Sequence, residues 1–224
     1  MKNTTLLIQG RINLECYNFY VNNYIDFPVV ISTWSSAVND IKIEELPSNF
    51  CVLFSKIPSV SGKLNCNLQI ESTKRGLKLV DTKYVIKMRG DEYYSNIKDL
   101  EALISSNENK IITSPVFFRS PTIRKYHISD HLIAGTTENL KKMFYFEKYD
   151  PTTFVEINLT MNFLSKVDKK YLDEPIDSMC RNFDIIDLTN HEPYKIVCNS
   201  RQKVWTNFIP EKNGSISKII NYKL

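Results

Sequence analysis

Short apolar runs alternate with stretches of helical periodicity through the first part of the chain. Residues 4–9 are rich in β-forming side chains and end at Gly10, which predicts a strand and a turn. Residues 14–24 then carry apolar and aromatic side chains at helical spacing. Residues 27–34 and 50–54 are continuous apolar runs, the pattern expected of strands covered on both faces of a parallel sheet. The pattern therefore predicts strand, helix and strand in succession.

The same alternation continues further along the chain. The other expected helices are residues 64–79, 96–105, 138–146 and 155–167, and the other expected strands are 83–88, 110–113, 131–135 and 183–187. Thr136 or Thr137 can cap the helix that begins at Glu138, because a threonine hydroxyl accepts a hydrogen bond from a first-turn N–H. The remainder is expected to be irregular, with one further hairpin. Strands alternating with helices predict an α/β domain with a mixed, mostly parallel sheet flanked by helices.

The composition fits one sizeable domain. The chain has 224 residues, of which 42% are hydrophobic and 24% charged, which excludes a disordered tail or a collagen-like rod. No apolar run approaches the roughly 20 residues of a membrane helix. No secretory signal is expected, and five scattered cysteines without a Cys-x-x-Cys pair fit reduced thiols in the cytoplasm. A net charge of +4 indicates a mild preference for anions.

Polar groups follow the first two expected strands. In open α/β sheets, ligands bind beyond the carboxyl ends of the strands. Gln9, Gly10 and Arg11 follow the first strand, and Thr33 and Trp34 end the second. These groups suit a nucleotide, on which Trp34 could stack. A tryptophan at such a position more often packs in the core or at the rim of a site. The chain lacks Gly-x-Gly-x-x-Gly, a Walker loop and Gly-x-Ser-x-Gly, which weakens dehydrogenase, ATPase and hydrolase interpretations.

Adjacent acids follow the strand expected at 83–88. Asp91 and Glu92 stand where carboxylates and phosphate oxygens together can hold a hard divalent cation. A solvated turn is an equally good interpretation, because acids are common in turns for local hydrogen-bonding reasons. Arg89 can hold a phosphate with two hydrogen bonds or pair with a neighbouring acid. The sequence leaves these uses open.

Two further carboxylates are candidates in the second half of the chain. Asp130 precedes an expected strand and is predicted either to face the same cleft as Asp91 or to pair with Arg124 or Lys125. Glu156 lies at the start of an expected helix, where an acid favours the helix dipole. The same position also suits a general base.

Several segments resemble the WavE family of lipopolysaccharide-synthesis proteins. Residues 67–77 and 84–92 match in spacing and in residue types, and residues 129–141 look like the family's Ser-Asp motif with the strand and helix that follow. Residues 8–10 and 31–34 also fit. The likeness runs from about residue 4 to about residue 165 and then fades. Such proteins look like GT-A type glycosyltransferases, a single nucleotide-binding α/β domain that uses a nucleotide-diphosphate sugar and a divalent metal, Mn²⁺ or Mg²⁺.

The resemblance also implies roles for individual residues. Asp91 would hold the metal, but the common Asp-x-Asp here reads Arg89-Gly90-Asp91, so Glu92 or Asp130 must help or the metal is held more weakly. Glu156 resembles an acid found near the acceptor. The residues expected to bind the nucleotide sugar are Gln9, Gly10, Arg11, Thr33, Trp34, Asn67, Gln69 and Arg75.

The predicted function is transfer of a sugar from a nucleotide-diphosphate sugar to a glycan or lipopolysaccharide-type acceptor. One domain, residues 1–224, would have a nucleotide-sugar half at about 1–115 and an acceptor half at about 116–224. The metal and Arg89 would stabilise the leaving diphosphate. Asp130 or Glu156 would accept the acceptor's proton if the reaction inverts. Asp91→Asn is predicted to abolish metal-dependent transfer and leave the fold intact.

Two other functions stay open at this point. A nucleotidyltransferase acting on sugar phosphates would also bring acids and a metal to strand ends, and it would release pyrophosphate. A noncatalytic glycan-binding or nucleic-acid-binding domain would suit a mildly basic chain with 12% aromatic residues. The preferred interpretation expects no nucleic acid, and any membrane contact is expected to be peripheral, through the acceptor.

Overall fold

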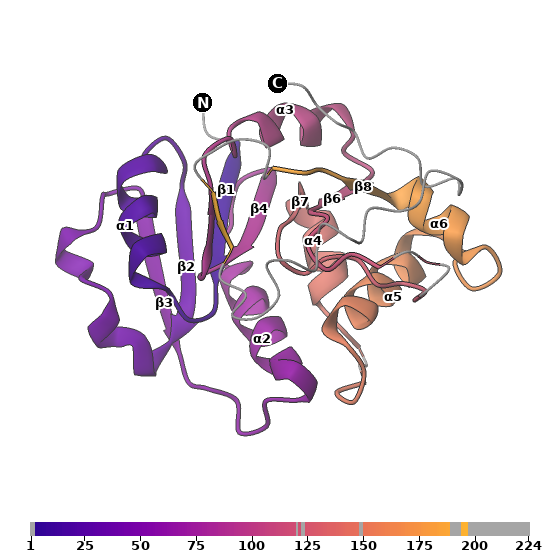
Figure 1. Cartoon of the computed structure of the whole chain (residues 1–224), viewed down its shortest axis with the longest axis horizontal. Helices are drawn as coiled ribbons and strands as arrows, with labels where there is room; N and C mark the ends of the chain where they lie inside the picture. Colours follow the sequence, from indigo (N-terminus) through magenta and orange to yellow (C-terminus); the bar gives the residue numbers. More distant parts are fainter. Residues whose placement is uncertain (1–2, 120, 122–123, 148–149, 189–193, 197–224) are drawn as a thin grey trace.

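The computed structural model describes residues 3–119, 121, 124–147, 150–188 and 194–196. A seven-stranded sheet in the order β3-β2-β1-β4-β7-β6-β8 lies at its centre (Figure 1). The strands of this sheet are β1 (Thr4–Gln9), β2 (Val29–Trp34), β3 (Phe50–Ser55), β4 (Tyr84–Arg89), β6 (Ile111–Thr113), β7 (Ile133–Thr136) and β8 (Phe183–Ile185). In this sheet β7 runs antiparallel to its neighbours and the other pairs are parallel. The mixed, mostly parallel sheet predicted from the sequence is confirmed.

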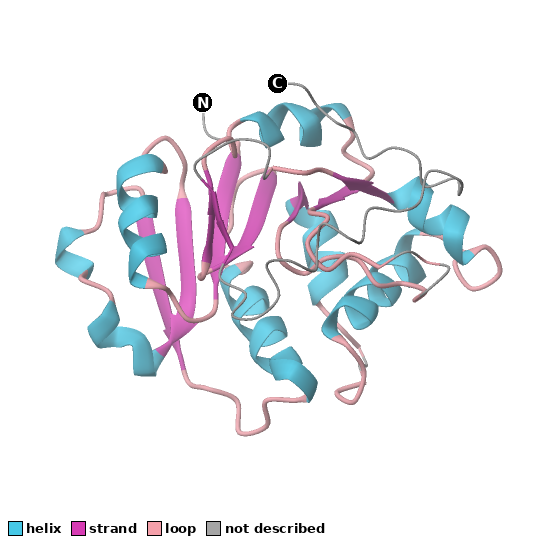
Figure 2. Ribbon diagram, viewed as in Figure 1, coloured by secondary structure: helices cyan, strands magenta, loops and turns pink. Residues whose placement is uncertain are grey.

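Helices cover both faces of the sheet (Figure 2). They are α1 (Leu14–Asn23), α2 (Cys66–Gly76), α3 (Asp99–Ser106), α4 (Thr137–Phe144), α5 (Val155–Val167) and α6 (Pro175–Asn182), with short 3-10 helices η1 (Ser35–Asp40), η2 (Ile43–Glu45) and η3 (Lys63–Asn65). The core on one face joins the sheet to α1 and α3, and the core on the other joins it to α2, α4 and α5. This two-sided cover explains the unbroken apolar runs of the central strands.

Strand β1 shows this burial within one element. Leu6 and Ile8 belong to the core beneath α1 and α3, whereas Leu7 belongs to the core beneath α2. All three side chains are fully buried. Because alternate side chains point to opposite faces, a strand buried on both sides must be apolar at successive positions.

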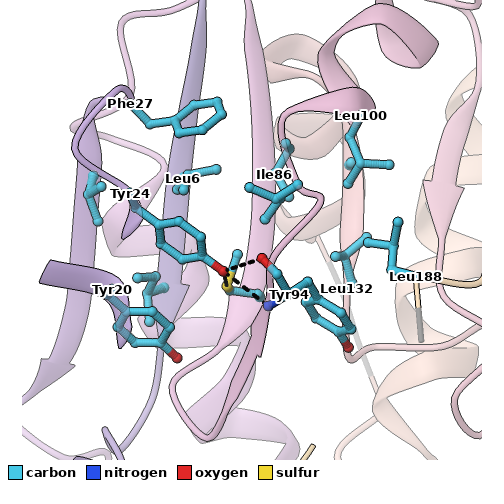
Figure 3. Packing of buried hydrophobic residues seen from close by; sticks show 14 of the residues in the cluster. Leu6, Tyr20, Tyr24, Phe27, Ile86, Tyr94, Leu100, Leu132 and Leu188 are labelled. Atoms are coloured by element: carbon cyan, nitrogen blue, oxygen red, sulfur yellow. Dashed lines mark hydrogen bonds between the residues drawn. The ribbon is translucent and has the colours of Figure 1, made fainter. Parts of the chain in front are cut away.

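The end of α1 is tied to the segment that follows β4. The Tyr24 hydroxyl donates to the Tyr94 carbonyl oxygen at 3.0 Å and accepts from the Tyr94 N–H at 3.1 Å (Figure 3). Tyr94 ends β5 (Glu92–Tyr94), which pairs with β9 (Tyr194–Ile196) in a separate two-stranded sheet. The turn between β4 and β5 is therefore anchored from the α1 side.

Most predicted elements are found within a few residues of the expected positions. Helix α5 has the expected bounds, and Thr136 caps α4 by accepting from the Asn139 N–H at 3.2 Å. Neither α6 nor β5 was expected. Helix α6 buries few side chains, and β5 spans only three residues, so neither leaves a clear period in the sequence. The hairpin expected late in the chain lies mostly outside the described residues, and β9 pairs with β5 instead.

The described part of the chain also bears on two other expectations. Its four cysteines, Cys16, Cys51, Cys66 and Cys180, are free thiols, and Cys198 lies outside the described residues. None of the described helices combines the length and apolar character needed to cross a membrane.

Gly90 allows the β4–β5 turn to pack against the loop after β1. A Cβ atom at Gly90 would lie 2.5 Å from the Arg11 carbonyl oxygen and 2.5 Å from Ile12 Cδ1. We expect Gly90→Ala to lower the free energy of unfolding by about 1–3 kcal/mol, because one of the two loops must move. Urea unfolding measures the loss, with the exposed Ser105→Ala as the control, expected within about 0.5 kcal/mol of the parent. Equal stability of the two variants would contradict the close packing.

Candidate functional site

A cavity of about 570 Å³ opens where the strand order of the sheet reverses. The chain passes from β1 to β2 and β3 on one side, and β4 then pairs with the other side of β1. Ligands of open α/β sheets bind at such a switch point, beyond the carboxyl ends of the strands. The cavity is lined by Gln9, Gly10, Arg11, Trp34, Ser36, Ala37, Ile57, Leu64, Asn65, Leu68, Gln69, Arg89 and Asp91.

The end of β1 contributes backbone to the cavity wall. Gly10 has a φ of +88°, a conformation that other residues adopt only with strain, and nothing lies within 4 Å of the place where a Cβ would stand. Its N–H donates to the Ser32 carbonyl oxygen at 3.0 Å. Gln9 is buried and its side-chain oxygen accepts from the Ser72 hydroxyl at 2.7 Å. This segment is therefore fixed, and a ligand can approach it closely.

Two buried oxygens near these strand ends have no hydrogen-bond partner among the described residues. They are Gln69 Oε1, on a residue that lines the cavity, and Thr33 Oγ1, at the end of β2. Buried polar atoms in folded proteins are nearly always paired. The Gln69 oxygen is therefore a candidate ligand contact.

Arg89 and Asp91 form a two-pronged ion pair in the cavity wall. Arg89 Nε donates to Asp91 Oδ1 at 2.9 Å, and Arg89 Nη2 donates to Asp91 Oδ2 at 2.8 Å. Both side chains are 26% exposed. Burial alone would lower the pKa of Arg89, but the hydrogen bonds with Asp91 and the charge of Glu92 outweigh it and raise that pKa. The guanidinium is thus a fixed, permanent cation at the cavity.

Behind this pair lies a buried polar network. The Glu92 carboxylate is fully buried, contacts His131 Nδ1 and accepts from the Tyr94 hydroxyl at 3.1 Å. Lys87 is also buried and donates to the Asp130 backbone carbonyl oxygen. Burial lowers the pKa of Lys87 to about 8, so the amine stays mostly protonated at pH 7.

Asp130 belongs to this buried network. It is 3% exposed and is not among the residues that line the cavity. Burial alone would raise its pKa, but the charges of His131, Lys87 and Arg89 hold it below the ordinary value. The structure therefore places Asp130 behind the cavity, with these three groups as its charged neighbours rather than the expected Arg124 or Lys125.

Glu156 lies in the first turn of α5, beside His127. Glu156 Oε1 is 3.9 Å from His127 Nε2, and the Glu156 side chain is 15% exposed. Burial and the charge of Asp130 raise the pKa of Glu156 to about 7. Burial and the charges of Arg119 and Arg124 lower the pKa of His127 to about 4. Near neutral pH, Glu156 therefore titrates beside a neutral imidazole.

Glu156 is outside the cavity lining, but the segment just before its helix contacts η3, which supplies part of that lining. The Lys63 N–H donates to the Pro151 carbonyl oxygen at 3.0 Å, so the loop before α5 packs against η3. The next residues, Leu64 and Asn65, line the cavity. The Lys63 amine also lies 4.3 Å from the centre of the Phe154 ring. These contacts bring the start of α5 to the edge of the cavity.

Three of the expected binding residues, Thr33, Asn67 and Arg75, are not among those that line the cavity, and Thr33 is fully buried. Asn67 donates to the Val60 carbonyl oxygen at 2.8 Å and so holds the loop before α2. Arg75 is near the far end of α2, where its Nε lies 3.5 Å from Glu71 Oε2.

Sequence reasoning missed the part of the lining that comes from η1, the loop after β3, η3 and the first turn of α2. The missed residues are Ser36, Ala37, Ile57, Leu64, Asn65 and Leu68. Leu64 and Asn65 adopt left-handed backbone conformations, with φ of +49° and +64°. Leu64 is also 69% exposed at the cavity. The pair Ser61-Gly62 indicates a turn in this segment. It does not indicate that the residues after the turn line the same cavity as the end of β1.

The acids near the cavity do not fit a divalent cation. Both Asp91 oxygens accept hydrogen bonds from Arg89, and the Glu92 carboxylate faces His131 and Tyr94. Within the described ranges, no group of three or more His, Cys, Asp or Glu side chains is arranged to hold a metal ion. A divalent cation beside a diphosphate needs at least one carboxylate that is free to bind it, and Asp91, the carboxylate in the cavity lining, already accepts two hydrogen bonds from Arg89. That Asp91 binds a metal stays a prediction, and the contacts of the Asp91 and Glu92 carboxylates do not support it.

The seven-stranded mixed sheet with helices on both faces is the GT-A-like fold expected from the sequence. Residues 27–212 match the sequence model of a family described as WavE lipopolysaccharide synthesis. The chain belongs to this family, which confirms the resemblance seen in the sequence. The match begins later than expected and extends well beyond residue 165, where the likeness was expected to fade.

Solved structures are similar to this chain in fold. Staphylococcus aureus TarS superposes with a TM-score of 0.51 at 15% identity, covering 84% of this chain and 35% of TarS. Mycobacterium tuberculosis glucosyl-3-phosphoglycerate synthase gives a TM-score of 0.49 at 14% identity, covering 83% of this chain and 70% of that one. A putative Bacillus anthracis glucose-1-phosphate thymidylyltransferase gives 0.48 at 10% identity, covering 74% and 84%.

The chain spans 55% of a TarS structure of residues 1–349. No curated protein sequence matches it.

Proposed function

We propose that this chain is a glycosyltransferase that moves a sugar from a nucleotide-diphosphate sugar to a glycan or lipopolysaccharide-type acceptor. The observation that carries the proposal is the cavity at the switch point of a GT-A-like sheet, with Arg11 and Arg89 in its wall. Membership of the WavE family supports the same function. The cavity's volume of about 570 Å³ is within the range of small-molecule sites.

The donor is proposed to lie against residues from the first half of the chain. Among the described residues, those that line this cavity all fall between 9 and 91, which supports a nucleotide-sugar half at about 1–115. Trp34, although mostly buried, lines the cavity and is proposed to contact the base or sugar, and the open backbone at Gly10 lets a phosphate approach. The acceptor half, about 116–224, supplies Glu156.

The proposed step replaces one C–O bond with another. The acceptor hydroxyl oxygen attacks the anomeric carbon of the donor sugar and forms the new glycosidic bond. The bond from that carbon to the diphosphate oxygen breaks, and the nucleoside diphosphate leaves with the electron pair. The acceptor's proton passes to a carboxylate, and the fixed cation at the cavity stabilises the charge that develops on the leaving group.

Glu156 suits the role of general base better than Asp130. A base works best when its pKa lies near the working pH, and burial raises the pKa of Glu156 to about 7. Asp130 is more deeply buried, and its charged neighbours hold its pKa below the ordinary value. We therefore assign proton transfer to Glu156. The divalent metal implied by the family resemblance, the cytoplasmic location and the peripheral membrane contact stay predictions.

Donor binding is expected to stabilise the protein against thermal unfolding. A ligand that binds the native state alone, at 100 times its Kd, raises the free energy of unfolding by about 2.7 kcal/mol. A thermal-shift screen of nucleotide sugars, run with EDTA and with Mn²⁺, measures this effect. Free sugars without the nucleotide serve as controls and are expected to give no shift.

A product assay then separates the transferase from its rivals. A hit from the screen is incubated with the protein and with lipopolysaccharide core sugars as acceptors. Release of nucleoside diphosphate supports the proposal, and release of pyrophosphate would identify a nucleotidyltransferase. Binding of a glycan without turnover of any donor would identify a noncatalytic domain.

A further inference from the structure

The ion pair between Arg89 and Asp91 conflicts with the use of Asp91 as a metal ligand. To bind a cation, Asp91 would have to release two charge-assisted hydrogen bonds, of 2.9 and 2.8 Å. The guanidinium, only 26% exposed, would then keep only the 3.4 Å contact between its Nε and the Glu92 carboxylate, and it would stand beside a dication. Like charges at short range in a partly buried site repel strongly, and losing two charge-assisted hydrogen bonds adds to that cost.

The same geometry makes Arg89 itself a suitable phosphate ligand. A guanidinium has five N–H groups, and the pair with Asp91 uses two of them. The planar fork matches phosphate oxygens, and its charge does not depend on pH in the physiological range. Because Asp91 already fixes its orientation, little side-chain entropy remains to be lost when a phosphate binds.

Arg11 adds a second cation to the same wall. It is exposed, it lines the cavity, and no hydrogen bond or ion pair of its guanidinium is found within the described ranges. The Gly90 N–H donates to the Gln9 carbonyl oxygen at 2.8 Å, so the loop carrying Arg11 is joined to the turn carrying Arg89. The two cations therefore stand on adjoining loops at one cavity.

We propose that Arg89, positioned by Asp91 and assisted by Arg11, binds and neutralises the donor's diphosphate without a divalent cation. Asp91 is then a positioning residue and holds no metal. This inference rests on the proposed function, since it concerns the diphosphate of the same donor.

Calorimetric binding of nucleoside diphosphates tests the inference without depending on turnover. The probes are UDP, GDP, dTDP and ADP, titrated into the full chain in EDTA and again in Mn²⁺. We expect the tightest-binding probe to show the same Kd in both conditions, within about twofold. Arg89→Gln is expected to weaken binding about 10- to 100-fold, because a charged hydrogen-bonding partner is lost.

Further variants keep the test decisive if Arg89→Gln folds poorly. Arg89→Lys keeps the positive charge but lacks the planar guanidinium with its several N–H groups, and it is expected to weaken binding about 10-fold. Arg11→Ala changes an exposed side chain and is expected to weaken it about 3- to 10-fold. Lys98→Gln, an exposed residue that pairs with Asp26, is the control and should leave the Kd unchanged.

Asp91→Asn gives opposite results for the two roles of Asp91. If Asp91 positions Arg89, the variant still binds the diphosphate in EDTA, within about threefold of the parent, and loses mainly kcat. If wild-type binding is more than about 10-fold tighter in Mn²⁺ and Asp91→Asn removes that gain, Asp91 holds a metal and the inference is overturned, while the proposed function stands. If no nucleoside diphosphate binds in either condition, the proposed function fails as well.

Discussion

Replacing Glu156 with glutamine is expected to lower kcat for sugar transfer by about 100- to 10,000-fold, the usual contribution of a general base. The amide has nearly the same shape as the carboxylate but cannot accept the acceptor's proton. Because Glu156 is outside the cavity lining, the donor's Kd should change little. Steady-state kinetics with the donor identified by the screen, together with calorimetry, separate the two quantities.

The pH dependence of kcat gives a second measure of the same residue. Burial and the charge of Asp130 raise the pKa of Glu156 to about 7. A base must be deprotonated to work, so kcat should be low at acid pH and rise as the pH passes through about 7. The residual activity of Glu156→Gln should lack this rise. His127, whose pKa is lowered to about 4, stays neutral over that range.

Two other carboxylates provide the comparison. Glu138 is 77% exposed on α4 and pairs with Lys142, so Glu138→Gln should keep both kcat and the pH profile. Asp130→Asn alters the buried network and is expected to lower stability, yet it should keep a rise of kcat with pH. If Asp130→Asn removes the rise and Glu156→Gln keeps it, Asp130 is the base and the assignment of Glu156 is wrong.

The fold was largely predictable because the central strands are buried on both faces. Leu6, Leu7 and Ile8 are apolar for that reason, and such a run is visible in a single sequence. The rule that ligands bind at strand ends also led to Gln9, Gly10, Arg11 and Arg89, all of which line the cavity.

The rest of the site depends on packing that the sequence pattern does not carry. An arginine two residues before an aspartate can bind a phosphate or pair with that aspartate, and the aspartate can instead hold a metal; the spacing is the same in each case. The burial of Asp130 and Glu92 follows from the way β7 and β5 pack beside β4. Leu64 reaches the cavity through a left-handed turn, which no hydrophobic period encodes.

Removing the Glu92 carboxylate is expected to have the largest effect on stability. Glu92 is fully buried, contacts His131 and Tyr94, and lies 3.4 Å from Arg89 Nε. In Glu92→Ala, buried Lys87 and Arg89 lose a compensating negative charge. Breaking a buried ionic network by removing one partner costs about 3–5 kcal/mol. Guanidinium unfolding at pH 7 should show this loss relative to the parent.

The matched control is Glu45→Ala, because Glu45 makes an exposed ion pair with Lys42 and should cost about 1 kcal/mol or less. If the loss in Glu92→Ala is electrostatic, the double variant Glu92→Leu with Lys87→Met should recover part of it, since the buried cation is removed together with its partner. If the losses in Glu92→Leu and in Lys87→Met simply add in the double variant, Glu92 and Lys87 act independently.

Because Glu92 also contacts Arg89, Glu92→Ala should weaken nucleoside diphosphate binding even where the protein stays folded.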